Sequence, residues 1–99
     1  MEYIVKRLDE FNDWLNDIKD SKTRLRLARR LDKAGRGLLG DVKPVGDDVW
    51  EMREFFGPGW RMYYVIRGEY IVIMLGGGDK SSQTKDIEIA LKRAESLGD

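Results

Sequence analysis

The apolar residues of this chain change their spacing twice, and this change limits the possible folds more than any other feature. Up to about residue 37 they recur every three or four positions, as in helices. From Asp41 to Leu75 they alternate or run together between turn residues, as in strands. From about Ser81 to Leu97 the helical spacing returns. The pattern predicts an α+β fold with two N-terminal helices, a meander of strands and a C-terminal helix.

A short strand and two helices are predicted before residue 41. The run Tyr3 to Val5 is β-branched and aromatic, which fits a first strand. The apolar stripe of the first helix contains Leu8, Phe11, Leu15 and Ile18, with Trp14 beside it. Ser21 is expected to cap the second helix, and Gly35 and Gly37 to end it. The stripe of this second helix contains Leu27, Ala28, Leu31 and Ala34, so its arginines are expected to face outward.

The middle of the chain predicts an antiparallel meander. The expected strands cover residues 42–45, 49–56, 60–66 and 69–75, separated by glycine-rich turns. Arg67 and Gly68 are expected to form a two-residue hairpin loop between the last two strands. Together with the strand at residues 3–5, these segments predict an antiparallel sheet that packs against the two N-terminal helices.

Alternation in the strands assigns side chains to the two faces of this sheet. The face expected to pack on the N-terminal helices contains Trp60, Met62, Tyr64, Ile66, Ile71, Ile73 and Leu75. The opposite face is expected to be exposed and to carry Glu51, Arg53, Phe55, Arg61, Tyr63 and Val65. A simple hairpin at residues 57–59 would place Arg53 opposite Tyr63 and Phe55 opposite Arg61. Two arginines, a carboxylate and a tyrosine would then share one exposed patch.

Composition restricts the chemistry available to that patch. The chain has 99 residues, enough for one domain over residues 1–99, and it has no cysteine and no histidine. Disulfides, thiolate nucleophiles and the usual metal ligand are therefore excluded, and no metal or cofactor is expected. The start of the chain lacks a signal peptide, and no apolar run is long enough for a bilayer, so we expect a cytoplasmic protein without a membrane partner.

Charge is balanced over the whole chain but not along it. The 18 basic and 18 acidic residues cancel, which by itself suggests a protein-interaction module rather than a nucleic-acid binder. The second helix is nevertheless basic, with Lys22, Arg24, Arg26, Arg29, Arg30, Lys33 and Arg36. This charge could meet an acidic partner, or it could be an ordinary solvated helix face.

The exposed patch contains groups that suit metal-free RNA cleavage. That reaction needs a base for the 2'-hydroxyl, positive charge on the phosphorane and an acid near the leaving oxygen. Arginine suits the second task because its planar fork binds phosphate and stays charged. Glu51 or Asp79 could act as base, and Lys80 or Tyr63 could assist the leaving group. Alternatively, Glu51 and Arg53 could be an ordinary surface ion pair.

Two further features allow more than one interpretation. The segment GGGDKSSQ at 76–83 resembles a phosphate-binding turn before a helix, although its spacing is not that of a Walker motif. It could equally be a helix start capped by Asp79 or Ser81, which needs no ligand. The three tryptophans are expected in the core rather than in a base-stacking platform, because their positions match the apolar face. They are Trp14, Trp50 and Trp60.

Four ordered motifs carry a family resemblance over nearly the whole chain. They are GDVKPVG at 40–46, WEMR at 50–53, GPGWRMYY at 57–64 and GGDKSSQ at 77–83. With this order of elements, the chain resembles the RelE/ParE toxin superfamily, specifically its HigB-like "addiction module killer protein" branch. The resemblance implies a RelE-like fold and a type II toxin that cuts mRNA in the ribosomal A site. It also implies a helix-turn-helix antitoxin, through which the toxin meets DNA only indirectly.

The resemblance also implies roles for individual residues. Arg61 matches the arginine that RelE-like toxins use on the scissile phosphate, so we expect its replacement by alanine to abolish cleavage but leave folding intact. The resemblance implies catalytic roles for Arg61, Arg53 and Lys80 and an RNA contact for Lys43. With the residues favoured above by their own chemistry and charge, the expected catalytic set is Arg61, Arg53, Lys80 and Glu51, and the expected RNA-binding set is Lys43, Arg26, Arg30, Tyr63 and Gln83. The chain lacks the histidine and the C-terminal tyrosine of several relatives, so the base stays open. ParE-like inhibition of DNA gyrase and a catalytically degenerate antitoxin-binding module are the alternatives.

Overall fold

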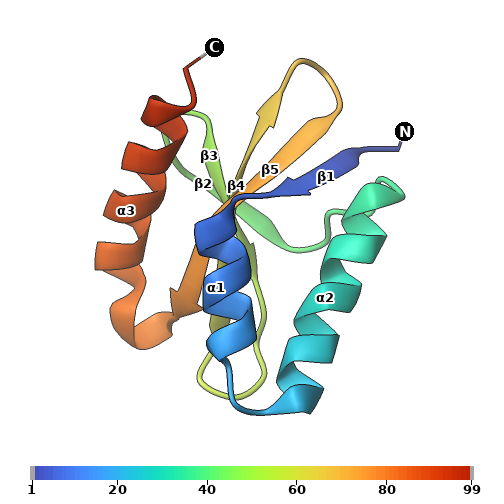
Figure 1. The fold of residues 1–99 in the computed structure, drawn as a ribbon, viewed down its shortest axis with the longest axis vertical. Coiled ribbons are helices and arrows are strands. Elements are labelled where there is room, and N and C mark those ends of the chain that lie inside the picture. The colour runs from blue at the N-terminus through green and yellow to red at the C-terminus, as the bar shows by residue number, and fades with distance from the viewer. Residues whose placement is uncertain (1, 99) are drawn as a thin grey trace.

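The computed structural model describes residues 2–98 and confirms the predicted α+β fold (Figure 1). Its elements in chain order are β1 (Ile4–Arg7), α1 (Asp9–Asp17), α2 (Ser21–Gly35), β2 (Val42–Gly46), β3 (Val49–Arg53), β4 (Trp60–Arg67), β5 (Ile71–Asp79), the 3-10 turn η1 (Lys80–Ser82) and α3 (Gln83–Ser96). No helix among residues 2–98 is long and apolar enough to cross a membrane.

The five strands form one mixed sheet in the order β1-β5-β4-β3-β2. Strands β2 to β5 are antiparallel neighbours, as the meander predicts. Strand β1 pairs with β5 in parallel, with Ile4 opposite Ile71, so the expectation of a wholly antiparallel sheet is wrong for this strand. Tight hairpins enforce antiparallel pairing, whereas β1 is joined to the sheet through two helices and is free to run either way.

Helices cover both faces of the sheet. The helices α1 and α2 lie on one face, and α3 lies on the other (Figure 1). The first core contains Phe11, Leu15, Leu27, Leu31, Ala34, Met52, Met62, Tyr64, Val72 and Met74. The second core contains Val49, Tyr63, Val65, Leu75, Ala90 and Ala94. The three tryptophans pack against the first core, as expected. The face that we expected to be exposed is therefore largely buried beneath α3.

The hairpin between β4 and β5 corrects part of the face assignment. Its loop has three residues rather than two, because Arg67 pairs with Ile71. Ile66 therefore lies opposite Val72 rather than Glu69, a shift of three positions, and a shift by an odd number of residues exchanges the two faces of β5. Val72 and Met74 face the N-terminal helices, whereas Ile73 and Leu75 pack on the α3 side.

The hairpin between β3 and β4 corrects the expected register. Strand β3 ends at Arg53 instead of residue 56, and the loop is longer than a simple turn. Arg53 therefore lies opposite Arg61, and Glu51 lies opposite Tyr63. These four residues share one face, but Glu51 replaces Arg53 as the neighbour of Tyr63.

Two further predictions need correction, namely the residue that caps α2 and the residue at which β5 ends. The cap of α2 is Asp20, whose carboxylate accepts from Lys22 N at 3.3 Å, while Ser21 is already helical. Strand β5 also continues through the glycine run to Asp79 instead of ending at Leu75. Glycine is required in this part of β5 because the Trp14 ring packs directly against the backbone. A Cβ at Gly77 would lie 2.5 Å from that ring.

Candidate functional site

A buried polar cluster lies between the sheet and the start of α3. It consists of Glu51 on β3, Arg61 and Tyr63 on β4 and Gln83 at the first turn of α3. Glu51 is 1% exposed and Arg61 is 6% exposed, so the expectation that Arg61 and Tyr63 lie on an exposed face is wrong. The shared face itself is correct. Strand parity does not reveal whether a later helix returns to cover that face.

The cluster is only partly satisfied by hydrogen bonds. Gln83 Nε2 donates to Glu51 Oε2 at 2.7 Å. Arg61 Nη1 donates to the carbonyls of Glu54 and Trp60, each at 3.1 Å. Glu51 Oε1 lies 3.7 Å from Arg61 Nε, and within residues 2–98 neither atom has a hydrogen-bond partner. Buried polar atoms without partners are costly, and they concentrate at functional sites.

Tyr63 is the most enclosed polar group of the cluster. Its ring is fully buried, and its hydroxyl has no partner among the described residues. Burial, and then the negative charge of Glu51, raises the pKa of Tyr63 well above its ordinary value. The phenol therefore stays protonated at any working pH. Tyr63 can donate a hydrogen bond, but it is a poor proton-transfer group.

Exposed side chains surround the edge of this cluster. Arg53 is partly exposed, and its Nη2 donates to Asp41 Oδ1 at 2.9 Å. Phe55 is 74% exposed, and the Cζ atoms of Arg53 and Arg61 each lie 5.7 Å from its ring centroid. Lys80 is also exposed. The strand alternation placed Phe55 on this face, but the sequence analysis gave it no role. An aromatic residue on the same face as Arg53 and Arg61 could have indicated one.

Gly59 brings Lys80 close to Arg61. Its φ of +82° favours glycine, and a Cβ there would lie 3.4 Å from Lys80 Cβ and 3.5 Å from Arg61 Nη1. The structure therefore gathers Arg53, Arg61 and Lys80 at one end of the sheet. Lys43 lies apart on β2, exposed and directly opposite Glu51 in the register.

The segment after the glycine run is a capped helix start. Asp79 accepts from Ser81 N at 2.8 Å, which confirms the capping interpretation, and it also accepts from the Ser81 hydroxyl. This hydroxyl, followed by the backbone bond, lowers the pKa of Asp79. A carboxylate with a lowered pKa is a weaker base, so Asp79 is less suited than a higher-pKa carboxylate to accept a proton.

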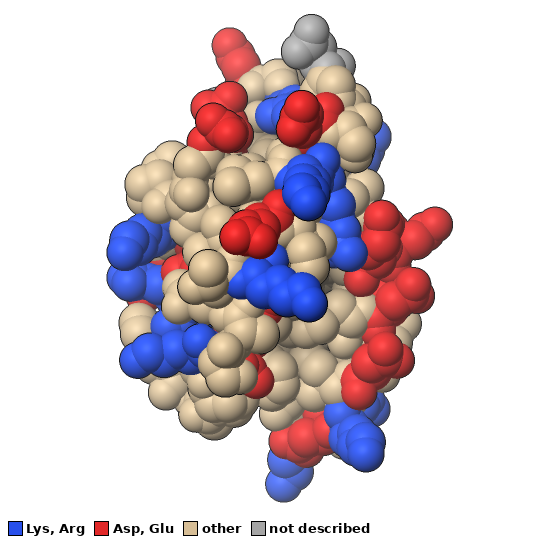
Figure 2. Space-filling view, turned by 90° about the vertical axis from the view of Figure 1, so that its left-hand side faces the viewer, with Lys and Arg blue, Asp and Glu red and all other residues tan. Residues whose placement is uncertain are grey.

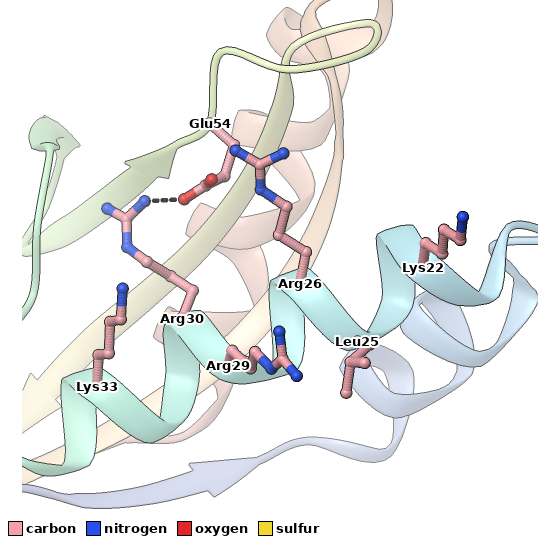
Figure 3. A pocket seen from close by; sticks show the side chains of 7 residues that line it. All are labelled: Lys22, Leu25, Arg26, Arg29, Arg30, Lys33 and Glu54. Atoms are coloured by element: carbon pink, nitrogen blue, oxygen red, sulfur yellow. Dashed lines mark hydrogen bonds and ion pairs between the residues drawn. The ribbon is translucent and has the colours of Figure 1, made fainter.

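A second cationic surface lies on α2. Lys22, Arg26, Arg29 and Lys33 are exposed around a shallow hollow of about 480 Å³, with Leu25, Arg30 and Glu54 completing its wall (Figure 3). The α3 side, by contrast, carries acidic and basic groups interspersed (Figure 2). The balanced charge of the whole chain therefore conceals one strongly basic helix face.

Arg30 differs from its neighbours on this helix. It donates to the carbonyls of Leu39, Asp41 and Arg53 and pairs with Glu54. Its side chain is only 11% exposed, so the expectation that it faces outward is wrong. The residues after α2 fold back across the helix and bury it. Arg26 does face outward, with its guanidinium 3.9 Å from the Phe56 ring centroid.

Comparison with known proteins gives consistent results. The family model of phage-derived Gp49-like proteins matches residues 13–95. An uncharacterized protein of Haemophilus influenzae is 36% identical over 94 residues, which cover 95% of both chains. The structure resembles a mutant of the E. coli toxin RelE in the free state, with a TM-score of 0.74 and 18% identity over 94% of this chain and 98% of that one. It also resembles a chain of the toxin-antitoxin complex RelBE2 from Mycobacterium tuberculosis, with a TM-score of 0.66 and 18% identity over 81% of this chain and 100% of that one.

Proposed function

This chain belongs to the phage-derived Gp49-like family, and from that membership we propose that it is the toxin of a type II toxin-antitoxin pair that cuts mRNA on the ribosome. The likeness to RelE supports the fold of such a toxin. The observation that carries the proposal is the gathering of Arg53, Arg61 and Lys80 beside a buried carboxylate. The motifs GPGWRMYY and GGDKSSQ further favour the HigB-like branch.

The proposed chemistry depends mainly on positive charge at the scissile phosphate. The 2'-hydroxyl loses its proton to solvent water as its oxygen attacks phosphorus, the bond from phosphorus to the 5' oxygen breaks, and a 2',3'-cyclic phosphate remains. Arg53 and Lys80, which solvent reaches, stabilise the charge that develops on the phosphorane, and the nearly buried Arg61 adds its positive charge from beneath them. Lys80 is the exposed group of the three, so its ammonium is suited to protonate the leaving 5' oxygen.

Glu51 is better suited to orient Arg61 than to contact RNA. It is almost fully buried, and Gln83 holds one of its oxygens. A carboxylate in this position attracts the guanidinium and keeps it aligned. Gln83 is therefore a positioning residue in this proposal. Tyr63 supplies a neutral hydroxyl, and Lys43 lies on the same face for a more distant phosphate.

The partners follow from the same proposal. A helix-turn-helix antitoxin would neutralise the toxin and supply the DNA contact at their promoter, and the likeness to a chain of a toxin-antitoxin complex supports such a partner. Arg26, together with Arg29 and Lys22 on α2, would dock on ribosomal RNA by neutralising phosphates rather than by reading bases.

Primer extension on mRNA from cells that express the chain tests this function. We expect discrete new 5' ends in the parent and a loss of roughly 10-fold or more in cleavage for Lys80→Ala. Lys80 is exposed, so this variant should fold. Lys85→Ala, at another exposed lysine of the same region, is the control and should cleave normally. Intact mRNA with DNA breaks would instead indicate a gyrase inhibitor, and growth without either lesion would indicate a degenerate antitoxin-binding module.

A further inference from the structure

We propose that Phe55 is a stacking site for one nucleobase of single-stranded RNA, with Arg53 and Lys80 contacting the neighbouring phosphates. This inference rests on the proposed function, because it takes RNA as the ligand. Its starting observation is that Phe55 has the largest exposed fraction among the exposed large apolar residues, 74% against 61% for Leu38. A single exposed apolar residue is ordinary, so the argument depends on what surrounds it.

Two fixed guanidiniums hold the Phe55 ring in place. The Cζ atoms of Arg53 and Arg61 both lie 5.7 Å from the ring centroid. Arg53 is anchored by Asp41, and Arg61 is anchored by the carbonyls of Glu54 and Trp60. Cations attract the ring through its quadrupole. The ring is thus oriented in advance while most of its surface stays open, which reduces the entropy cost of stacking a base on it.

The charge around Phe55 favours a polyanion over a protein partner. The nearby cations are Arg53, Arg61 and Lys80. The carboxylates around them are Glu51, Asp41, Glu54, which pairs with Arg30, and Asp79, which caps the turn at Ser81. Glu51 is buried, and Asp41 already pairs with Arg53. Lys80, which lies beside Gly59 of the hairpin loop that also contains Phe55, therefore remains an exposed positive charge. RNA supplies both required groups, an unpaired base and adjacent phosphates.

Phe55 also joins the two cationic surfaces of the molecule. The next residue, Phe56, packs under Arg26 of α2 with 3.9 Å between the guanidinium carbon and the ring centroid. The consecutive residues Phe55 and Phe56 thus contact arginines on the α3 side and the α2 side of the sheet, respectively. A strand that crosses this hairpin would meet positive charge on both sides of the stacked base.

Single strands should be preferred over duplexes at this site. The bases of a duplex are stacked on each other and cannot lie on a protein ring without unpairing. Stacking on an aromatic side chain depends weakly on which base is present, so we expect little sequence preference from Phe55 alone. Its contribution to affinity should be roughly 10-fold.

Fluorescence anisotropy with a labelled single-stranded RNA, measured without ribosomes, tests the proposal. Phe55→Leu keeps apolar bulk but removes the ring, and we expect it to weaken binding by roughly 10-fold. Phe55→Trp should bind at least as tightly as the parent. The matched control is Tyr70→Leu, which removes an aromatic side chain that is 50% exposed in the other hairpin and should change nothing.

Three results would overturn the proposal. They are unchanged RNA binding by Phe55→Leu, an equal loss for duplex and single strand, and a loss of antitoxin binding with RNA binding intact. Cleavage is scored separately in cells. If mRNA is cut but Phe55→Leu binds RNA like the parent, this inference fails while the proposed function stands. If binding depends on Phe55 but mRNA stays intact, the nuclease proposal fails and the stacking site stands.

Discussion

Glu51 Oε1 and Arg61 Nε face each other across 3.7 Å in the protein interior, and among residues 2–98 neither atom has a hydrogen-bond partner. The pair lies beneath α3, with side chains only 1% and 7% exposed. Each charge is compensated mainly by the other. Removing one of them should therefore be far more damaging than the sequence suggests for an exposed strand residue.

The first prediction is that Arg61→Ala lowers the free energy of unfolding by about 3–5 kcal/mol, because it leaves Glu51 as an uncompensated buried charge. Urea denaturation measures the change. The double variant Glu51→Gln with Arg61→Met removes both charges and should lose much less. A single variant as stable as the parent would show that the two groups do not depend on each other. Loss of cleavage by Arg61→Ala would thus need a check of folding first.

The second prediction separates Arg30 from the other arginines of α2. Arg30→Ala removes one donor each from three carbonyls and from Glu54, so we expect the free energy of unfolding to fall by about 2–3 kcal/mol. Arg29→Ala, at an exposed position one residue earlier, should change it by no more than about 0.5 kcal/mol. Equal effects of the two substitutions in thermal or urea unfolding would refute the structural role of Arg30.

The third prediction concerns ribosome docking by the basic surface of α2. Reversing Arg26 and Arg29 to Glu should weaken ribosome binding. The slope of the logarithm of the binding constant against the logarithm of the salt concentration should also become shallower, by roughly one for each lost phosphate contact. The measurement is sedimentation with ribosomes over a salt series. Reversing the exposed Lys85 and Lys92 of α3 makes the same change in net charge and serves as control. If the parent and the Arg26/Arg29 variant bind ribosomes with the same salt dependence, this surface is an ordinary solvated helix face and not a docking site.

The fourth prediction uses the raised pKa of Tyr63. An unfolded tyrosine ionises near pH 10, and burial followed by the charge of Glu51 makes the folded protein hold the proton to higher pH. The contribution of Tyr63 to stability is therefore complete below about pH 10 and is lost as pH rises above it. Tyr63→Phe should unfold like the parent near neutral pH, within about 1 kcal/mol, because the Tyr63 hydroxyl has no partner among residues 2–98.

The same substitution should reduce the loss of stability between neutral pH and pH 11, measured by urea unfolding at each pH. The pKa of Tyr64 is raised to about 12, so Tyr64 also lowers the free energy of unfolding at alkaline pH. This decrease is present in both parent and variant, and only the difference between their pH profiles reports on Tyr63. Identical alkaline profiles for parent and Tyr63→Phe would contradict a raised pKa for Tyr63. A large loss of cleavage at neutral pH with stability intact would show that the hydroxyl contacts substrate.

The sequence alone was sufficient for the elements and for the shared face of the candidate site. Helix and strand periods are local properties of the backbone, so the spacing of Phe11 and Leu15, or of Met62 and Tyr64, indicates element type and facing directly. It was also sufficient to place Glu51, Arg53, Arg61 and Tyr63 on one side of the sheet. The expected α+β fold followed from the order of elements, and the RelE-like architecture followed from the family resemblance that the sequence motifs carry.

Only the tertiary structure decided which groups are buried and which residues meet. The parallel pairing of β1, the covering of Arg61 by α3 and the burial of Arg30 all join segments that are distant in the chain. Strand register depended on where the turn between β4 and β5 begins and ends, and the resulting shift of three positions exchanged the faces of Ile73 and Met74. Burial and pairing depend on residues that are distant in the sequence, and the local spacing of apolar residues carries no information about them. For that reason the face of the site was predictable, whereas its burial, its charge pairing and the open Phe55 ring were not.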